Sequence, residues 1–236
     1  MKRKKTPPGF VCKTLSSGRI VFAIRRKSLD IYTVHTDVSR ELDRLVKFTN
    51  QFNCVKFHLA RSNRYFWKID LRAAFDHVTF ESMSSLKDLP REVWYTPSLF
   101  FHENGGLIQG APASPKLFQL FCQQGIDPII QEFCKRNALT YTRYADDLLF
   151  SCRVPIGKSA REKIRRIIRE RGFQINEDKV KLVDTCKEHL VYLGMNIFGG
   201  KASPTEEFIN RLDHTPKGAS QAGMLGWKNS VLACNR

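Results

Sequence analysis

Three aspartates stand where carboxylates are unusual. Asp70 closes a short aromatic run, and Asp146 and Asp147 are adjacent between two other strand-like runs. Brought together, such carboxylates would repel one another and raise their own pKa values unless divalent cations lay among them. Mg²⁺ accepts one or two carboxylates plus substrate phosphates, so the three residues predict metal-assisted transfer from a nucleoside triphosphate. A plainer interpretation of Asp70 or Asp146, taken singly, is a turn or strand-end residue satisfied by backbone groups.

Strands are expected to position these acids. Alternate side chains of a strand point to opposite faces, so Asp70 emerges opposite the apolar face of the run 65–71. The runs 139–144 and 148–151 predict a hairpin with the aspartate pair at its tip. A tight turn is what allows two adjacent carboxylates to act near one point.

Helices and a further strand complete the predicted framework. A strand with a basic end begins at Gly18, and residues 37–52 have the pattern of a helix. Ser114 followed by Pro115 is typical of a helix start, with Ser114 as the cap. Residues 159–162 have capping-box spacing and predict a helix that ends at Gly172.

The charge balance points to a polyanionic partner. The 236 residues include 39 Lys and Arg against 23 Asp and Glu, a formal charge of +16. Each phosphate neutralised by Lys or Arg releases counterions and adds salt-dependent affinity, so we expect nucleic acid. A merely soluble basic surface is the alternative. For the basic run in the predicted helix 159–172, a solvated face and a face near nucleic acid both stay open.

Other classes of protein are disfavoured. The seven cysteines form no Cys-x-x-Cys pair, and we expect reduced, mostly buried thiols. No apolar run approaches the roughly 18 residues of a transmembrane helix, and the basic first residues lead into no apolar signal stretch. We therefore expect a cytoplasmic protein without a membrane partner.

Five motifs together resemble the palm motifs of reverse transcriptases, in the same order. They are residues 66–76 (FWKIDLRAAFD), 109–115 (QGAPASP), 144–147 (YADD), 172–179 (GFxxNxxK) and 192–194 (YLG). The resemblance covers about residues 65–197, and within the family the sequence is most similar to bacterial enzymes of the retron and phage-defence branches. Its bacterial character implies a bacterial cytoplasmic location.

The resemblance implies a role for each motif. Asp70, Asp146 and Asp147, with the carbonyl of Leu71, would hold two Mg²⁺ ions, or Mn²⁺ as an alternative. Lys179 would protonate or stabilise the leaving pyrophosphate. The deoxynucleotide would contact Phe75 as a steric gate, together with Gln109 and Gly110; the primer grip would be Tyr192, Leu193 and Gly194. In the fingers, Arg19, Arg25 and Arg26 are candidates for contacts with the triphosphate.

The resemblance also implies an α+β fold of the right-hand polymerase type, with an antiparallel palm sheet backed by helices. We expect a basic arm and fingers in residues 1–64 and a palm in 65–197, with part of the fingers inserted at 77–108. Only about forty residues follow Gly194, so we expect a minimal thumb or tail in 198–236.

The implied activity is RNA-directed DNA synthesis from dNTPs on an RNA template with a DNA or RNA primer. The implied setting is a bacterial antiviral or retroelement system whose noncoding RNA supplies the template, with further protein subunits as partners. Two alternatives stay open. One is a template-independent or protein-primed DNA nucleotidyltransferase, favoured by the short thumb. The other is a noncatalytic RNA-binding subunit, which would have no need of three acids.

Overall fold

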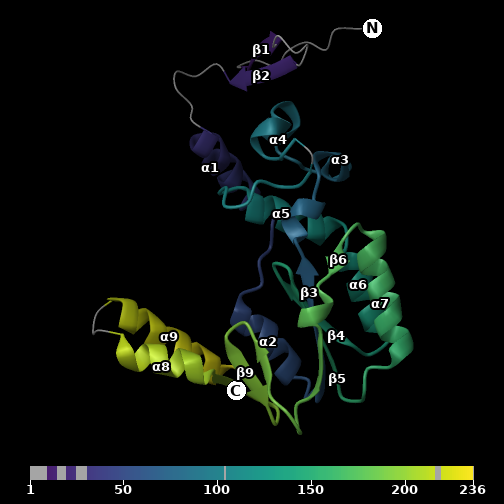
Figure 1. Cartoon of the computed structure of the whole chain (residues 1–236), viewed down its shortest axis with the longest axis vertical. Coiled ribbons are helices and arrows are strands. Elements are labelled where there is room, and N and C mark those ends of the chain that lie inside the picture. Colours follow the sequence, from purple (N-terminus) through teal and green to yellow (C-terminus); the bar gives the residue numbers. More distant parts are fainter. Residues whose placement is uncertain (1–9, 15–19, 25–30, 104, 216–218, 236) are drawn as a thin grey trace. The chain divides into compact units, whose positions relative to one another are not determined.

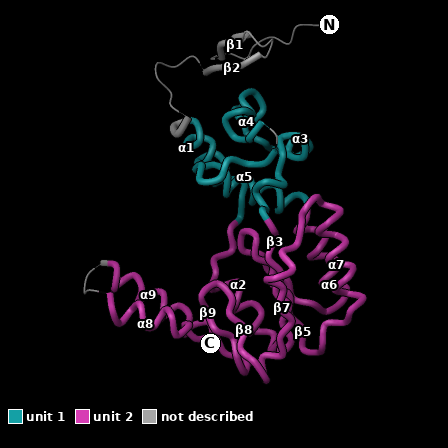
Figure 2. Tube along the Cα trace, viewed as in Figure 1, with its two compact units in different colours: residues 1–47, 73–125 teal, residues 48–72, 126–236 magenta. Residues whose placement is uncertain are grey.

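The computed structural model describes residues 10–14, 20–24, 31–103, 105–215 and 219–235. The chain forms two compact units, each assembled from separate stretches of sequence (Figure 2). Unit 1 contains residues 1–47 and 73–125, and unit 2 contains residues 48–72 and 126–236. The chain therefore leaves unit 2 directly after the strand that carries Asp70.

Unit 1 is built mainly from short helices. Its elements are β1 (Phe10–Thr14), β2 (Ile20–Ile24), α1 (Ile31–Leu42), η1 (Ala74–His77), α3 (Phe80–Met83), α4 (Arg91–Tyr95), η2 (Pro97–Leu99) and α5 (Ser114–Gln124). The two longer helices, α1 and α5, contact each other. Val38, Leu42 and Leu117 are buried and supply part of the core of this unit.

Unit 2 contains an antiparallel sheet (Figure 1). Its strands are β3 (Tyr65–Arg72), β4 (Thr140–Tyr144), β5 (Asp147–Cys152), β6 (Gln174–Ile175) and β7 (Lys181–Asp184). β5 lies between β4 and β3, and β3 also pairs with β6 and β7. The strand and the hairpin predicted to carry the aspartates are therefore neighbours, as the sequence indicated.

The two faces of this sheet are covered by different elements. On one face, Phe66 and Leu149 belong to a buried cluster with Cys54 and Val55 of α2 (Gln51–Leu59). On the other face, the ring of Trp67 packs against Phe150. α6 (Asp127–Arg136) and α7 (Lys158–Glu170) belong to this second side, where Arg165 of α7 lies over the Trp67 ring.

A smaller sheet and two helices follow. β8 (Leu190–Tyr192), β9 (Met195–Phe198) and β10 (Lys201–Pro204) form an antiparallel sheet, with β9 in the middle. α8 (Glu206–His214) and α9 (Ala219–Ala233) come next. Asn235, just after α9, holds β10 because its side chain bonds both the N–H and the carbonyl of Ala202, at 2.6 and 2.8 Å.

The helix predicted over residues 37–52 is wrong as a single element. α1 ends at Leu42, and α2 begins at Gln51. The side chain of Asn50 accepts a hydrogen bond from the N–H of Asn53 at 2.7 Å, so it caps a new helix. The two helices also belong to different units.

Both predicted serine caps are wrong, although both helices exist. Ser114 is the first helical residue of α5, and its hydroxyl donates to the carbonyl of Ile108 at 2.5 Å. α7 begins at Lys158, with Gly157 as a cap that has no side chain, so Ser159 and Glu162 form no capping box. Gly172 follows the end of α7 with a φ of 82°, a left-handed conformation that glycine adopts easily.

The remaining broad expectations agree with the structure. The antiparallel sheets and separate helices confirm an α+β class. Five of the six cysteines whose side chains are described are buried, Cys186 is exposed, and all six are free thiols. In the described part of the chain, no helix is both long enough and apolar enough to cross a bilayer.

Candidate active site

Asp70 and Asp147 lie in direct register on neighbouring strands. β3 and β5 pair antiparallel, and Asp70 is opposite Asp147. Opposed residues of such a pair have Cβ atoms about 4.5–5.5 Å apart, so both side chains leave the same face close together. The N–H of Leu71 donates to the carbonyl of Asp146 at 3.0 Å, which ties the end of β3 to the hairpin tip. The structure thus brings the three acids to one end of one sheet.

The side chain of Arg143 holds the tip of the β4–β5 hairpin in place. Ala145 has a φ of 52°, in the left-handed region. Its carbonyl accepts a hydrogen bond from Nη1 of Arg143 at 2.9 Å. The other nitrogens of this guanidinium fork onto the carboxylate of Asp127, with Nε at 2.9 Å and Nη2 at 2.7 Å. The first residue of α6 therefore fixes the arginine that fixes the turn.

Asp70 is buried, and both of its carboxylate oxygens have partners. Oδ1 accepts from Nζ of Lys179 at 3.1 Å, and Oδ2 accepts from Nδ2 of Asn176 at 3.2 Å. The hydrogen bond and charge of Asp70 raise the pKa of Lys179 above its usual value. Lys179 thus reaches the acid cluster, and its charged form is favoured there.

Asp147 is in a less balanced environment. Its Oδ1 is buried and has no hydrogen-bond partner within the described structure, although Nζ of Lys68 forms an ion pair with it at 3.3 Å. Burial raises the pKa of Asp147, and the nearby charges of Asp146 and Asp70 raise it further, against the opposing effect of Lys68. The cluster thus has three carboxylates but only two paired ammonium groups, those of Lys68 and Lys179.

This donor set fits a hard divalent cation. Carboxylate oxygens are the ligands that Mg²⁺ and Mn²⁺ prefer, and a metal at Oδ1 of Asp147, which is buried without a hydrogen bond, would replace the ion pair with Lys68. Among the described residues, no three acidic, histidine or cysteine side chains already converge as a metal cage. Lys179 and Asn176 engage Asp70 instead, so its side chain would have to exchange these partners for a metal.

The motif predicted as a primer grip forms the β8–β9 turn. Leu193 and Gly194 have φ values of 50° and 74°, as in the tight turns that join twisted strands. The ring of Tyr192 is fully buried, and its hydroxyl lies 3.5 Å from the carbonyl of Asp147. Tyr192 thus lies inside the core beneath the hairpin of the acids, while Leu193 is half-buried and Gly194 is exposed.

Phe75, the predicted steric gate, belongs to unit 1. It lies in η1, half-buried, and its ring stacks on Phe118 of α5 with centroids 4.9 Å apart. The carbonyl of Phe75 accepts from the N–H of Leu107 at 2.9 Å. A Cβ at Gly106 would lie 2.0 Å from the same carbonyl oxygen, so only glycine fits beside this backbone.

Gln109 and Gly110 also lie in unit 1, and both are exposed. Nε2 of Gln109 donates to Oδ1 of Asp76 at 3.1 Å, and Gly110 has a φ of 81°. These two residues and Phe75 are thus gathered within unit 1, while the acids, Lys179 and the β8–β9 turn are gathered within unit 2. Arg19, Arg25 and Arg26 lie outside the described residues.

Four residues of the site were not predicted from sequence. Lys68 shares the strand face of Asp70 by the two-residue period, which was a usable signal. Asn176 stands three positions before Lys179 within the fourth motif, and it could have been singled out there. Arg143 and Asp127 form their ion pair because α6 packs against β4, and no sequence pattern predicted this pair.

Two solved structures are similar to this chain. A telomerase structure from Candida tropicalis matches with a TM-score of 0.50 and 12% identity, over 73% of this chain and 45% of that one. A foamy viral protease-reverse transcriptase in complex with an RNA/DNA hybrid matches with a TM-score of 0.49 and 18% identity, over 77% and 23%. The first of these likenesses supports the polymerase fold.

Curated relatives are retron reverse transcriptases of bacteria. The Ec83 enzyme of Escherichia coli is 29% identical over 72% of this chain, and the Mx65 enzyme of Myxococcus xanthus is 29% identical over 53%. The chain spans 58% and 34% of their respective lengths. The model of the family described as reverse transcriptase (RNA-dependent DNA polymerase) matches residues 19–197. By that match, which covers most of the sequence and all five motifs, the chain belongs to the reverse transcriptase family.

Proposed function

We propose that this protein is an RNA-directed DNA polymerase that adds dNTPs to the 3′-end of a primer. One observation carries the proposal: Asp70 and Asp147 are opposed on adjacent strands, with Asp146 at the adjoining turn. Family membership supports the same reaction, and the basic charge of the chain suits a nucleic-acid template and primer.

Each site residue has a proposed role. Asp70, Asp146, Asp147 and the carbonyl of Leu71 hold the divalent ions, two Mg²⁺ in our proposal or Mn²⁺ in their place. When bound, these ions supply Lewis-acid activation of the primer hydroxyl and of the leaving pyrophosphate. Lys179, which pairs with Asp70, protonates or stabilises the leaving pyrophosphate. On the other unit, Phe75 excludes a ribose 2′-hydroxyl, and Gln109 and Gly110 contact the nucleotide.

The proposed domains follow the predicted boundaries: a basic arm and fingers in 1–64, further fingers in 77–108, the remainder of 65–197 as the palm, and thumb or tail residues in 198–236. The β8–β9 turn, Leu193 and Gly194 above all, would contact the primer end through its backbone, since the Tyr192 ring is buried. Arg19 and Arg25 remain proposed triphosphate contacts.

The biological setting is also a proposal. The curated relatives are retron enzymes of bacteria, which supports a noncoding RNA as template, a bacterial cytoplasmic location and a role in antiviral defence or a retroelement. Further protein subunits would be partners in such a system. Copurification of RNA with the full chain, followed by sequencing of that RNA, tests the template assignment.

A primer-extension assay tests the reaction itself. Purified protein is incubated with Mg²⁺, labelled dNTPs and a primed RNA, beside Asp146→Ala and a reaction without template. Template-matched DNA that the variant fails to make supports the proposal. DNA of fixed composition made without template would instead identify a template-independent or protein-primed transferase. If the wild type makes no DNA even when copurified RNA and partner proteins are supplied, a noncatalytic RNA-binding subunit would be favoured.

A further inference from the structure

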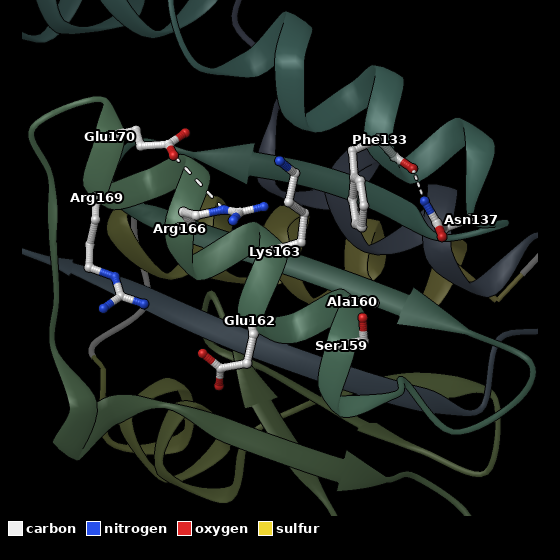
Figure 3. A pocket seen from close by; sticks show the side chains of 9 residues that line it. All are labelled: Phe133, Asn137, Ser159, Ala160, Glu162, Lys163, Arg166, Arg169 and Glu170. Atoms are coloured by element: carbon white, nitrogen blue, oxygen red, sulfur yellow. Dashed lines mark hydrogen bonds and ion pairs between the residues drawn. The ribbon is translucent and has the colours of Figure 1, made fainter.

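A basic hollow lies between α6 and α7, away from the acids. Its volume is about 830 Å³, and it is lined by Phe133, Asn137, Ser159, Ala160, Glu162, Lys163, Arg166, Arg169 and Glu170. Figure 3 shows Lys163 and Arg166 reaching from α7 toward the side where Phe133 and Asn137 of α6 lie. We call this whole space the basic hollow, after its three basic side chains, Lys163, Arg166 and Arg169.

The basic hollow is on the other side of the sheet from the candidate active site. Arg165 of α7 lies over the ring of Trp67, at 5.7 Å from its centroid. Trp67 and Asp70 are three positions apart on β3, and a strand turns such residues to opposite faces. A ligand in the basic hollow would therefore leave the aspartates free.

Positive charge accumulates on α7 and is neutralised locally only in part, because Arg165 pairs with Glu177 while the other basic side chains have weak partners or none among the described residues. The helix carries six basic and two acidic side chains in 13 residues. Arg166 approaches Glu170 only to 3.9 Å, and both side chains are about 60% exposed, so this pair holds the arginine weakly. Within the described structure, Lys163 makes no ion pair at all.

A second hollow, with both basic and acidic side chains, continues around the helix. Its volume is about 440 Å³, and it is lined by Glu162, Arg165, Arg169, Gln174, Ile175 and Glu177. Glu162 and Arg169 belong to both hollows, so Arg169 links the two. A long anion that crosses α7 would thus meet Lys163, Arg166 and Arg169 at successive positions, whereas a small anion would fill a fraction of this surface.

The chemistry of the lining favours a phosphate backbone. Protein partners usually require an apolar core, and protein interfaces are depleted in lysine. Phe133 is the single aromatic residue of this lining, while Ser159 and Asn137 add hydroxyl and amide groups of the kind that contact phosphate and sugar oxygens. Arg and Lys are the usual phosphate ligands.

We propose that the basic hollow binds the phosphate backbone of folded RNA and anchors it on the sheet face opposite the aspartates. The choice of RNA rests on the proposed function, because an RNA-directed polymerase must hold its template outside the few nucleotides at the active site. The anchor would bind RNA in the absence of dNTPs and of synthesis, which makes it testable by itself.

Binding of a labelled RNA hairpin to the full chain, measured over a series of salt concentrations, tests the anchor. The double variant Lys163→Gln/Arg166→Gln should bind several-fold more weakly, and the slope of log K against log[salt] should become shallower by roughly two. Glu170→Gln should bind more tightly, because it removes a negative charge and the weak partner of Arg166. Tighter binding is a result that loss of folding cannot produce.

Lys187→Gln/Lys201→Gln is the matched control, since it removes two exposed charges elsewhere on unit 2. An equal loss of affinity in this control would overturn the proposal in favour of a merely solvated basic surface. A DNA hairpin of the same sequence that binds equally well and responds equally to the variants would overturn the assignment to RNA.

Primer extension on a short template that cannot reach α7 separates this proposal from the proposed function. We expect the Lys163→Gln/Arg166→Gln variant to extend it at the wild-type rate. Loss of extension together with loss of binding would show that the basic hollow is not separate from the active site. If the wild type makes no DNA but the hairpin result holds, the polymerase proposal fails and the RNA-binding surface stands.

Discussion

Lys179 donates a hydrogen bond to Asp70 across 3.1 Å, so the lysine predicted to act on pyrophosphate is paired with a carboxylate predicted to hold metal. The second oxygen of Asp70 is bonded to Asn176. A divalent cation at Asp70 would compete with the ammonium group for Oδ1. Binding of the cation would therefore release Lys179 toward the phosphates of the nucleotide.

This competition predicts opposite effects of one substitution. Lys179→Gln should bind Mg²⁺ a few-fold more tightly, because the ammonium no longer competes for Asp70, and it should lower kcat by roughly 10²-fold because a charge near the leaving group is lost. Thermal unfolding at increasing MgCl₂ gives the affinity, and single-turnover extension gives the rate. Lys181→Gln, an exposed lysine on β7, is the control. Weaker Mg²⁺ binding by Lys179→Gln would refute the competition.

The acid cluster should be stabilised by metal. Mg²⁺ is expected to raise the Tm of the wild type, since a ligand at ten times its Kd contributes about 1.4 kcal/mol. Asp146→Asn and Asp147→Asn should lose most of this shift and all detectable extension. Asp213→Asn, an exposed carboxylate on α8, should keep both. An undiminished Mg²⁺ shift in both active-site variants would place the metal elsewhere.

The stacked position of Phe75 predicts its effect on sugar selection. The ring is held against Phe118, so it presents a fixed edge that a 2′-hydroxyl would meet. Phe75→Ala should lower the preference for dNTPs over NTPs, measured as a ratio of kcat/KM values, on the order of 10–200-fold. Phe48→Ala, at a side chain that is 57% exposed, controls for loss of an aromatic ring. An unchanged ratio would remove Phe75 from the nucleotide site.

Local patterns predicted the elements that carry the acids. The period of two along 65–71 placed Asp70 opposite Trp67, and two strand-like runs placed the aspartate pair at a hairpin tip; both are confirmed. Helix ends were harder to predict from the sequence. The hydroxyl of Ser114, for example, donates to the carbonyl of Ile108 rather than to a group of its own helix. The choice between these partners depends on a loop that approaches only after folding.

The other features of the site depend on contacts between residues far apart in the sequence, so the sequence did not predict them. The resemblance assigned Tyr192 to a primer contact, yet its ring is buried beneath the hairpin of Asp147. The bond between Arg143 and Asp127 joins residues 16 positions apart through the packing of a helix on a strand. Neither feature has a local period, so sequence alone gave the types of these residues and left their partners open.

The buried Arg143–Asp127 pair predicts a positioning role. Arg143→Lys keeps the charge but loses the fork on Asp127 and the bond to the carbonyl of Ala145, and Asp127→Asn leaves a buried arginine without its counter-charge. Each should destabilise the fold, by about 3–5 kcal/mol where one partner of a buried pair is lost. Extension below the Tm of the variants should show a reduced kcat with a nearly unchanged KM for dNTP. Wild-type kcat in both variants, once folded, would mean that the pair serves stability alone.

His58 of α2 bridges the two strands of the same hairpin, and its burial predicts a pH dependence of stability. Nδ1 lies 2.5 Å from Oγ of Ser151 on β5, and Nε2 lies 2.9 Å from Oγ1 of Thr142 on β4. Burial lowers the pKa of His58 from 6.5 to about 3. Between these two pKa values, His58 is protonated in the unfolded chain and neutral in the folded chain. The folded state therefore has its full stability above pH 6.5 and loses stability as the pH falls below that value.

Urea unfolding between pH 5 and 7.5 checks this dependence. We expect His58 to contribute up to about 1.4 kcal/mol per pH unit below 6.5, and His58→Gln to remove that part of the slope. The variant should be less stable than the wild type at pH 7, because the bridge is weakened, and the difference should shrink toward pH 5. His214→Gln, an exposed histidine on α8, should keep the wild-type slope. A slope unaltered by His58→Gln would mean that this imidazole accepts its proton in the folded state, with the β4–β5 hairpin rearranged around it.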